Sequence, residues 1–258
     1  MQIVLIKTMN NLISNDNLEI IKNRYYFTKK FIKNKKILEI GCGFGIGFEY
    51  LKKDCKSYEG IDYNKKHIYL AKKNNYSNQS KFRVLNFSQL HLLKKKFDVI
   101  ICLATIYYLD FNHFLRVCKK HLNKNGVVIF DTSNKNILGF DGSWDKQTKY
   151  YQVPELNNLL RKQGFAVKIF GAHPHEKSNV ILIKYKIRLF IKEFLKLLNM
   201  FFLKNFLTFV FDRKFIEMPN SINIQMKKYK YKYQYVSPVK KNYNFRVILV
   251  AATIQNGN

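Results

Sequence analysis

The sequence predicts an α/β fold built on a doubly wound parallel sheet, and three observations predict it. Short apolar runs alternate with segments of helical periodicity, as in successive strand–helix units. The length of 258 residues suits one large domain with a smaller attachment. Gly41, Gly43 and Gly45 follow the first apolar run, Ile37–Ile40, and precede a predicted helix start. A strand, a glycine turn and a helix N-terminus in this order form a nucleotide-type site.

The spacing of these glycines excludes two common nucleotide-binding motifs. A dinucleotide fingerprint, G-x-G-x-x-G, needs its third glycine where this chain has Ile46. A Walker loop needs Gly-Lys-Ser/Thr, which does not follow. The pattern Glu39-x-Gly41-x-Gly43-x-Gly45 instead resembles the first motif of the class I S-adenosylmethionine-dependent methyltransferases. A purely structural glycine turn is the alternative.

The resemblance covers residues 24–170 and, with the closing strand, most of the chain; it includes the "FDVI" segment at Phe97–Ile100. It implies a Rossmann-like, mostly parallel sheet of seven strands, with an antiparallel last strand and a helical insert before it. The implied organisation is a cofactor-binding core with an N-terminal helix at 1–185, a basic amphipathic helical insert or cap at 186–225, and a returning segment at 226–258.

The first helix and the second strand lead to a candidate ribose contact. Residues 16–33 have near-helical apolar spacing and precede the first strand. The second strand, Ser57–Ile61, ends at Asp62, and Tyr63 follows it. An acid at this position can accept hydrogen bonds from ribose hydroxyls, whereas capping of the next helix is the alternative. The resemblance places Asp62 and Tyr63 beside the cofactor.

The third strand, Lys81–Leu85, is followed by a candidate adenine contact. The methyltransferase family commonly has an acid here, which meets the adenine amino group, but this chain has Asn86. An amide oxygen can still accept that hydrogen bond. The next side chain, Phe87, is expected to lie against the adenine face.

The fourth strand, Phe97–Leu103, points to the acceptor side of the site. Ligands of open α/β sheets lie at the carboxyl edge, where this strand ends. Leu103 is therefore a predicted cofactor contact, and Tyr107 and Tyr108 in the next loop are predicted to face the methyl donor or acceptor. Aromatic packing beneath the loop is the alternative for these two tyrosines.

The segments that follow complete the strand–helix alternation. A helix is expected at 111–121, with Gly126 as a left-handed stop before the fifth strand, Val127–Phe130. Residues 133–150 form a long polar loop, which predicts a functional segment or lid. A short helix then leads to the sixth strand, Ala166–Phe170.

His173 and His175 follow the sixth strand at the expected ligand edge. An imidazole there can act as a general base toward the acceptor. No third Cys, His or acid stands at metal-site spacing, so no metal site is expected.

Two basic segments lie before the last strand, Phe245–Thr253. Residues 186–212 combine a basic stripe with apolar positions, which is typical of a helix in a membrane interface or of an insert covering the active site. Their longest uncharged run is seven residues, too short to span a bilayer. Residues 227–235 alternate Lys and Tyr, as in a single-stranded nucleic-acid contact or a half-exposed strand.

The formal net charge is +29, from 46 Lys and Arg against 17 Asp and Glu. Such a charge attracts nucleic acid, anionic lipid or acidic substrates, although AT-rich codon usage accounts for much of it. Four scattered cysteines without a CxxC pair fit a reducing compartment. The apolar run Gln2–Ile6 is too short for a signal peptide. We expect a basic cytoplasmic protein, with peripheral contact to anionic membrane through 186–212.

The resemblance implies an S-adenosylmethionine-dependent methyltransferase, most similar to the broad small-molecule group with a type 11 domain. It would methylate an oxygen or nitrogen of a small molecule, with glycan or lipid-linked acceptors among the candidates by analogy. An RNA methyltransferase and a non-enzymatic membrane-binding protein on the same fold are the alternatives. The implied cofactor contacts are Glu39, Gly41, Cys42, Gly43, Gly45, Asp62, Tyr63, Asn86, Phe87 and Leu103; the acceptor-side candidates are Tyr107, Tyr108, His173 and His175.

Overall fold

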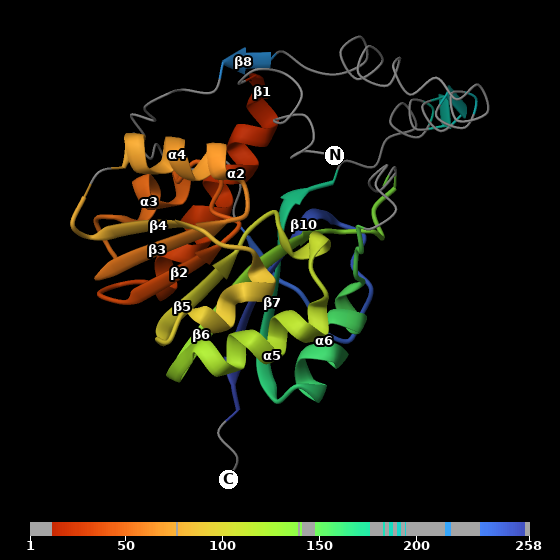
Figure 1. Ribbon diagram of the computed structural model, residues 1–258. Coiled ribbons are helices and arrows are strands. Elements are labelled where there is room, and N and C mark those ends of the chain that lie inside the picture. Colours follow the sequence, from red (N-terminus) through yellow and green to blue (C-terminus); the bar gives the residue numbers. More distant parts are fainter. Residues whose placement is uncertain are drawn as a thin grey trace.

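The structure is a computed structural model that describes residues 12–75, 77–138, 140, 148–175, 215–217 and 233–255, and also positions 183, 186, 187, 190, 191 and 194. Its centre is an eight-stranded sheet in the order β4-β3-β2-β5-β6-β10-β7-β9 (Figure 1). The strands are β2 (Lys36–Ile40), β3 (Ser57–Asp62), β4 (Ser80–Val84), β5 (Phe97–Cys102), β6 (Leu122–Ser133), β7 (Phe165–Pro174), β9 (Gln234–Tyr235) and β10 (Phe245–Ile254).

The first five strands of this sheet are parallel, whereas β10 is inserted antiparallel between β6 and β7. The predicted mostly parallel sheet with an antiparallel last strand is therefore confirmed. The predicted number of seven strands was one short, because β9 adds an exposed two-residue edge strand within the Lys/Tyr segment. So short a strand offers little unpaired backbone at the edge of the sheet.

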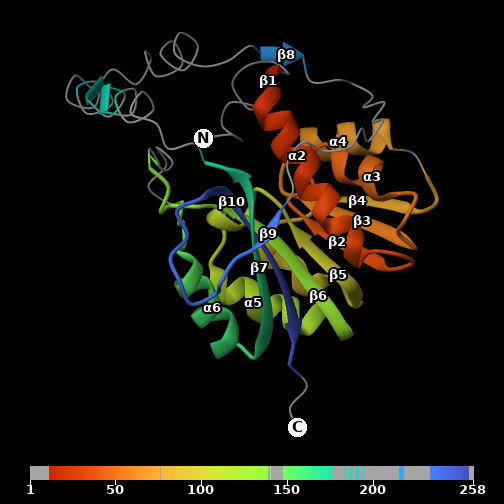
Figure 2. The same ribbon diagram turned by 180° about the vertical axis from the view of Figure 1, so that it is seen from behind.

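Helices cover both faces of the sheet, with α2, α3 and α4 on one and α5 and α6 on the other (Figures 1 and 2). Their bounds are α2 Asn15–Thr28, α3 Ile46–Leu51, α4 Lys65–Asn74, α5 Phe111–His121 and α6 Val153–Lys162, with short 3-10 helices η1 Lys29–Phe31, η2 Phe87–Leu92 and η3 Ile106–Tyr108.

Successive strand residues supply two separate cores. Ile37 and Ile101 pack in the cluster on the side of α3, whereas Leu38 and Ile100 pack in the cluster that contains Phe114 of α5. Side chains alternate between the faces of a strand, so a strand between two helical layers must be apolar at nearly every position. This requirement explains the continuous apolar runs in the sequence.

The turn before the fifth predicted strand differs from the expectation. β6 begins at Leu122, and Asn125, not Gly126, has the left-handed conformation, with φ 62°. Gly126 is needed for space instead: a Cβ there would lie 2.9 Å from the carbonyl oxygen of Asn123 and 3.1 Å from that of Asp98. Asn tolerates left-handed dihedrals, so the turn forms with glycine one place later.

The predicted insert at 186–225 lies mostly outside the described residues. The single described positions between 183 and 194 have helical backbone, and β8 (Phe215–Glu217) pairs antiparallel with β1 (Leu12–Ser14). The loop predicted at 133–150 is also described only in part. Within the described residues, no helix combines the length and apolar character needed to cross a membrane.

Candidate cofactor and acceptor site

The glycine bend leaves β2 at the carboxyl edge of the sheet and is fastened to β3. Gly41, Gly43 and Gly45 all have positive φ, at 75°, 55° and 82°. The N–H groups of Gly41 and Cys42 donate to the Ile61 carbonyl at 2.9 and 3.1 Å. These dihedrals are strained for residues with a Cβ, which explains why glycine recurs at alternate positions.

The three glycines differ in what surrounds them. A Cβ at Gly41 would lie 2.4 Å from Thr105 Oγ1, and one at Gly45 would lie 2.7 Å from the Asn75 side chain. A Cβ at Gly43 would meet no atom within 4 Å. The bend is thus closed by protein on two sides and open at Gly43, where its backbone is accessible to a ligand.

Asp62 lies beside this opening. Its carboxylate accepts a hydrogen bond from the Gly43 N–H at 3.0 Å and another from the Asn64 N–H at 2.9 Å. Burial alone would raise the pKa of Asp62, but the His67 imidazole, 3.6 Å away, and the hydrogen bonds from these two N–H groups hold it below its usual value. Asp62 is therefore an anchored anion with lone pairs left for further donors. Tyr63, the next residue, is exposed.

Glu39 lies beneath the bend, away from the opening. Its carboxylate is buried and accepts hydrogen bonds from the hydroxyls of Tyr25 and Tyr58. Burial raises the pKa of Glu39 to about 7, although both tyrosine hydroxyls act in the opposite direction. A Cβ at Gly47 would lie 2.1 Å from Glu39 Oε2, so glycine at this position lets α3 pass over the carboxylate.

Cys42 also turns its side chain into the core. The thiol is buried, and its sulfur would lie 2.8 Å from a Cβ placed on Gly60 of β3. Burial raises the pKa of this thiol well above its usual value. Only the backbone of Cys42 remains as a candidate ligand contact.

The predicted adenine corner is formed, but its residues are engaged in structure. The Asn86 side chain is exposed and caps η2: its oxygen accepts hydrogen bonds from the N–H and hydroxyl of Ser88. The Phe87 ring is half-buried and contacts His113 and Phe114 of α5, with ring centroids 5.4 and 6.0 Å away. Asn86 stays accessible to a ligand, whereas one side of Phe87 is taken up by α5.

The loop after β5 continues the edge. Leu103 is buried, and its carbonyl accepts a hydrogen bond from the Thr105 hydroxyl at 3.0 Å. Tyr107 is buried and stacks on Tyr150, with centroids 5.4 Å apart, while Tyr108 is 39% exposed. Of the two tyrosines predicted to face donor or acceptor, Tyr107 thus packs beneath the loop and Tyr108 keeps an exposed edge.

A buried ion pair missed by the sequence reasoning closes this region. Arg24 of α2 contacts Asp131 Oδ2 through Nε at 2.8 Å and through Nη2 at 2.7 Å. Asp131 Oδ1 accepts a hydrogen bond from the N–H of Ala104, which has φ 53°. Asp131 follows the apolar run of β6 as Asp62 follows that of β3, so the same strand-end rule would have found it.

The two predicted histidines lie further along the edge. His173 is buried with φ 56°, and its Nε2 lies 3.2 Å from the Asn23 side-chain nitrogen of α2. His175 is half-buried, and its backbone N–H donates to the Asn244 carbonyl at 2.7 Å. Within the described residues, no group of three His, Cys, Asp or Glu side chains is arranged to hold a metal ion.

These contacts join into one chain along the carboxyl edge. Asp62 of β3 contacts Gly43 of the bend, and Gly41 of the bend lies against Thr105 in the loop after β5. Ala104 of that loop donates to Asp131 of β6, which binds Arg24 of α2. Asn23, next to Arg24, contacts His173 of β7. An open glycine backbone, an anchored carboxylate and a polar wall therefore share one edge, an arrangement suited to a nucleoside and a second small molecule.

Comparison with known proteins agrees with this geometry. Residues 38–130 match the methyltransferase domain family. The chain is 36% identical over 114 residues to a ubiquinone biosynthesis O-methyltransferase from Pelagibacter ubique, covering 43% of this chain and 47% of that protein. It is 29% identical over 155 residues to a tRNA U34 carboxymethyltransferase from Nautilia profundicola, covering 54% and 51%. The chain thus spans about half the length of these curated relatives.

Solved structures share the fold at low sequence identity. A SAM-dependent methyltransferase from Thermotoga maritima, described as a possible histamine N-methyltransferase, has a TM-score of 0.57 at 14% identity and covers 99% of this chain and 100% of its own. A SAM-dependent methyltransferase from Archaeoglobus fulgidus has a TM-score of 0.57 at 18% identity, covering 91% and 93%. Residues 38–130 thus match a methyltransferase domain, as the resemblance predicted, and the fold is shared with these methyltransferase structures.

Proposed function

We propose that this protein is an S-adenosylmethionine-dependent methyltransferase that transfers a methyl group to an oxygen or nitrogen of a small molecule. The observation that carries the proposal is the opening at Gly43 beside the anchored carboxylate of Asp62. Two adjacent strands here supply an accessible backbone and an anion side by side at the carboxyl edge of the sheet. This combination fits a nucleoside whose sugar presents hydroxyl donors.

When bound, S-adenosylmethionine supplies a methyl group that its sulfonium has already activated. Asp62 accepts hydrogen bonds from the ribose hydroxyls, and the glycine backbone allows the amino-acid part to approach closely. Arg24 and Asp131 hold the loop after β5 that borders the acceptor side. The chain's contribution is then mainly positioning, which can supply much of the reduction in barrier.

An oxygen acceptor is our first choice because the relative from Pelagibacter ubique is named an O-methyltransferase. The net charge of +29 favours peripheral contact with anionic membrane, which we propose occurs through residues 186–212. Such contact would bring the protein to a lipid-linked acceptor. Tyr108 and His173 are the proposed acceptor-side contacts, since both lie at this edge. His175, two residues after His173, is the third proposed acceptor-side contact.

RNA methylation is the second candidate. The relative from Nautilia profundicola is named a tRNA carboxymethyltransferase, and the net positive charge suits a polyanionic substrate. Labelled methyl transfer to small phenolic acceptors, compared with transfer to total tRNA, distinguishes the candidates. Incorporation into tRNA alone would contradict the small-molecule proposal.

Replacing Asp62 tests the cofactor assignment. Hydrogen bonds to a charged group contribute about 1.5–3 kcal/mol, so Asp62→Ala should weaken S-adenosylmethionine binding by about tenfold or more in calorimetry. Asp54→Ala is the matched control, because within the described part of the chain the Asp54 side chain forms just a surface ion pair with Lys29, at 3.0 Å. Equal affinity in the two variants would reject Asp62 as the ribose contact.

A further inference from the structure

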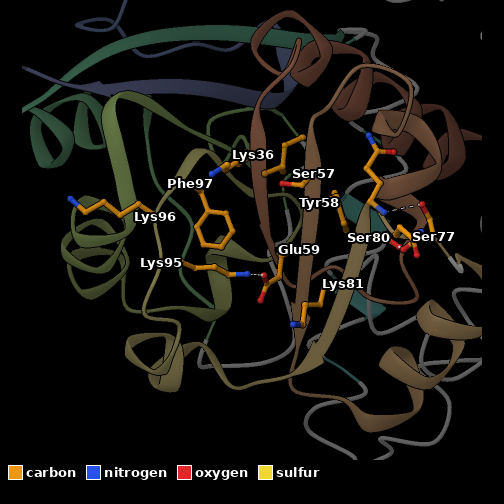
Figure 3. Close-up of a pocket in the computed structure, with 13 residues that line it drawn as sticks. Lys36, Ser57, Tyr58, Glu59, Ser77, Ser80, Lys81, Lys95, Lys96 and Phe97 are labelled. Atoms are coloured by element: carbon orange, nitrogen blue, oxygen red, sulfur yellow. Dashed lines mark hydrogen bonds and ion pairs between the residues drawn. The ribbon is translucent and has the colours of Figure 1, made fainter.

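A cavity lies at the opposite edge of the sheet. It has a volume of about 590 Å³ and is formed where β2, β3, β4 and β5 begin (Figure 3). Small-molecule sites typically measure about 300–1,000 Å³. The cofactor site lies where the same strands end, so this cavity is a separate place on the protein.

The cavity carries an excess of positive charge. Its lining includes four lysines, Lys36, Lys81, Lys95 and Lys96, and one acid, Glu59. Figure 3 shows Lys36, Lys81 and Lys95 grouped around Phe97 and Glu59, with the Lys96 side chain directed away from them. Lysines contributed by β2, β4 and the loop before β5 thus line one hollow.

The single acid does not cancel this charge. Glu59 is buried, and its carboxylate is paired with Arg83 Nε at 2.7 Å and with the Lys95 ammonium. Arg83 and Lys95 together outweigh the one negative charge that they share. Among the described residues, Lys36 and Lys81 form no ion pair, so their ammonium groups are available to an anion.

Polar groups complete the lining. Ser57, Ser77 and Ser80 are half-buried around the cavity, together with the amides of Asn78 and Gln79. Ser80 Oγ donates to the Asn75 carbonyl at 2.8 Å, and the Gln79 amide to the Cys55 carbonyl at 2.6 Å. These bonds fix the loop before β4, while no bond occupies the Ser57 hydroxyl among the described residues. Hydroxyl donors beside lysines suit phosphate oxygens.

We propose that this amino-edge pocket binds a phosphate-bearing small molecule. Lys36 and Lys81 contact the phosphate oxygens. Lys95 keeps its ion pair with Glu59 and so fixes the base of the pocket. Tyr58 and Phe97 are buried and leave little apolar surface for a ring, so charge and hydroxyl donors supply the recognition. The pocket goes beyond methyl transfer and does not depend on the proposed reaction.

Calorimetric titration of the full chain with inorganic pyrophosphate tests the proposal. We expect saturable binding at one site, weakened about tenfold or more by Lys36→Gln with Lys81→Gln. The matched control is Lys120→Gln with Lys162→Gln, which removes the same charge from exposed positions on α5 and α6. The control should change the affinity by less than about twofold, since only the general field is altered.

A second experiment, with vesicles, separates two sources of the phosphate group: a soluble molecule and a lipid headgroup. Phosphatidylcholine vesicles with and without phosphatidic acid are sedimented with each variant. Capture that needs phosphatidic acid, Lys36 and Lys81, without binding of pyrophosphate, assigns the pocket to a lipid headgroup. Equal losses in the pocket and control variants, or no binding of either probe, would overturn the proposal. S-adenosylmethionine binding is measured on every variant, so a lost fold is recognised separately.

Discussion

The two edges of the sheet differ in the groups that they present to a ligand. At the carboxyl edge, Asp62 and Asp131 are buried and held in place by N–H groups or a guanidinium, and glycine backbone is accessible beside Asp62. At the amino edge, Lys36 and Lys81 are exposed. The first edge would recognise a ligand by shape and fixed hydrogen bonds, whereas the second would offer charge that solvent ions can screen.

Two buried glutamates make the contrast clearer. Among the described residues, the Glu39 carboxylate on β2 accepts hydrogen bonds from tyrosine hydroxyls alone, whereas the Glu59 carboxylate on β3 has two cations. A buried carboxylate without a cation is costly to ionise, and its pKa rises accordingly. The comparison teaches that burial alone does not fix the charge of an acid in this sheet.

The largest expected effect comes from breaking the Arg24–Asp131 pair. Arg24→Leu leaves Asp131 buried without its cation and should lower the free energy of unfolding by about 3–5 kcal/mol. Denaturant unfolding measures this loss. The double variant Arg24→Leu with Asp131→Leu should recover part of it, because no unpaired charge remains. Additive losses in the double variant would show that the two side chains do not interact.

The next effect concerns the pH dependence caused by Glu39. Its folded pKa of about 7 lies above the usual value of 4.5, so the folded state holds a proton that the unfolded state releases between these values. Wild-type stability should therefore fall, by roughly 3 kcal/mol from this group, as pH rises from 4.5 to 7.

Glu39→Gln is the matched variant, since it keeps the shape and cannot ionise. The difference in unfolding free energy between wild type and this variant should change across that window and stay constant above pH 7. A constant difference from pH 4.5 to 7 would mean that Glu39 is ionised throughout.

The smallest effect is the difference in salt response between the edges. The Debye length falls from about 30 Å to about 8 Å as ionic strength rises from about 0.01 M to about 0.15 M. Pyrophosphate affinity should fall several-fold across this range, whereas S-adenosylmethionine affinity should change little. Parallel calorimetric titrations compare the two; equal salt slopes would remove the distinction between the edges.

Much of the fold, and the placement of Asp62 beside the glycine bend, could be predicted because they are local in sequence. The glycine bend, the strand before it and Asp62 at the end of the next strand lie within about one strand–helix–strand unit. The roles of Asn86 and Phe87 were harder to predict, since capping of η2 and packing on α5 compete with ligand contact.

By itself, the sequence determined the order of strands and helices, the positive-φ bend and the acid beside it, because apolar periodicity and glycine act over a few residues. Only the tertiary structure decided that Arg24 meets Asp131, 107 residues away, and that Tyr107 is buried. It also gathered Lys36, Lys81 and Lys95 around one hollow. Such contacts depend on how separate strands are placed side by side, and no local pattern encodes that placement.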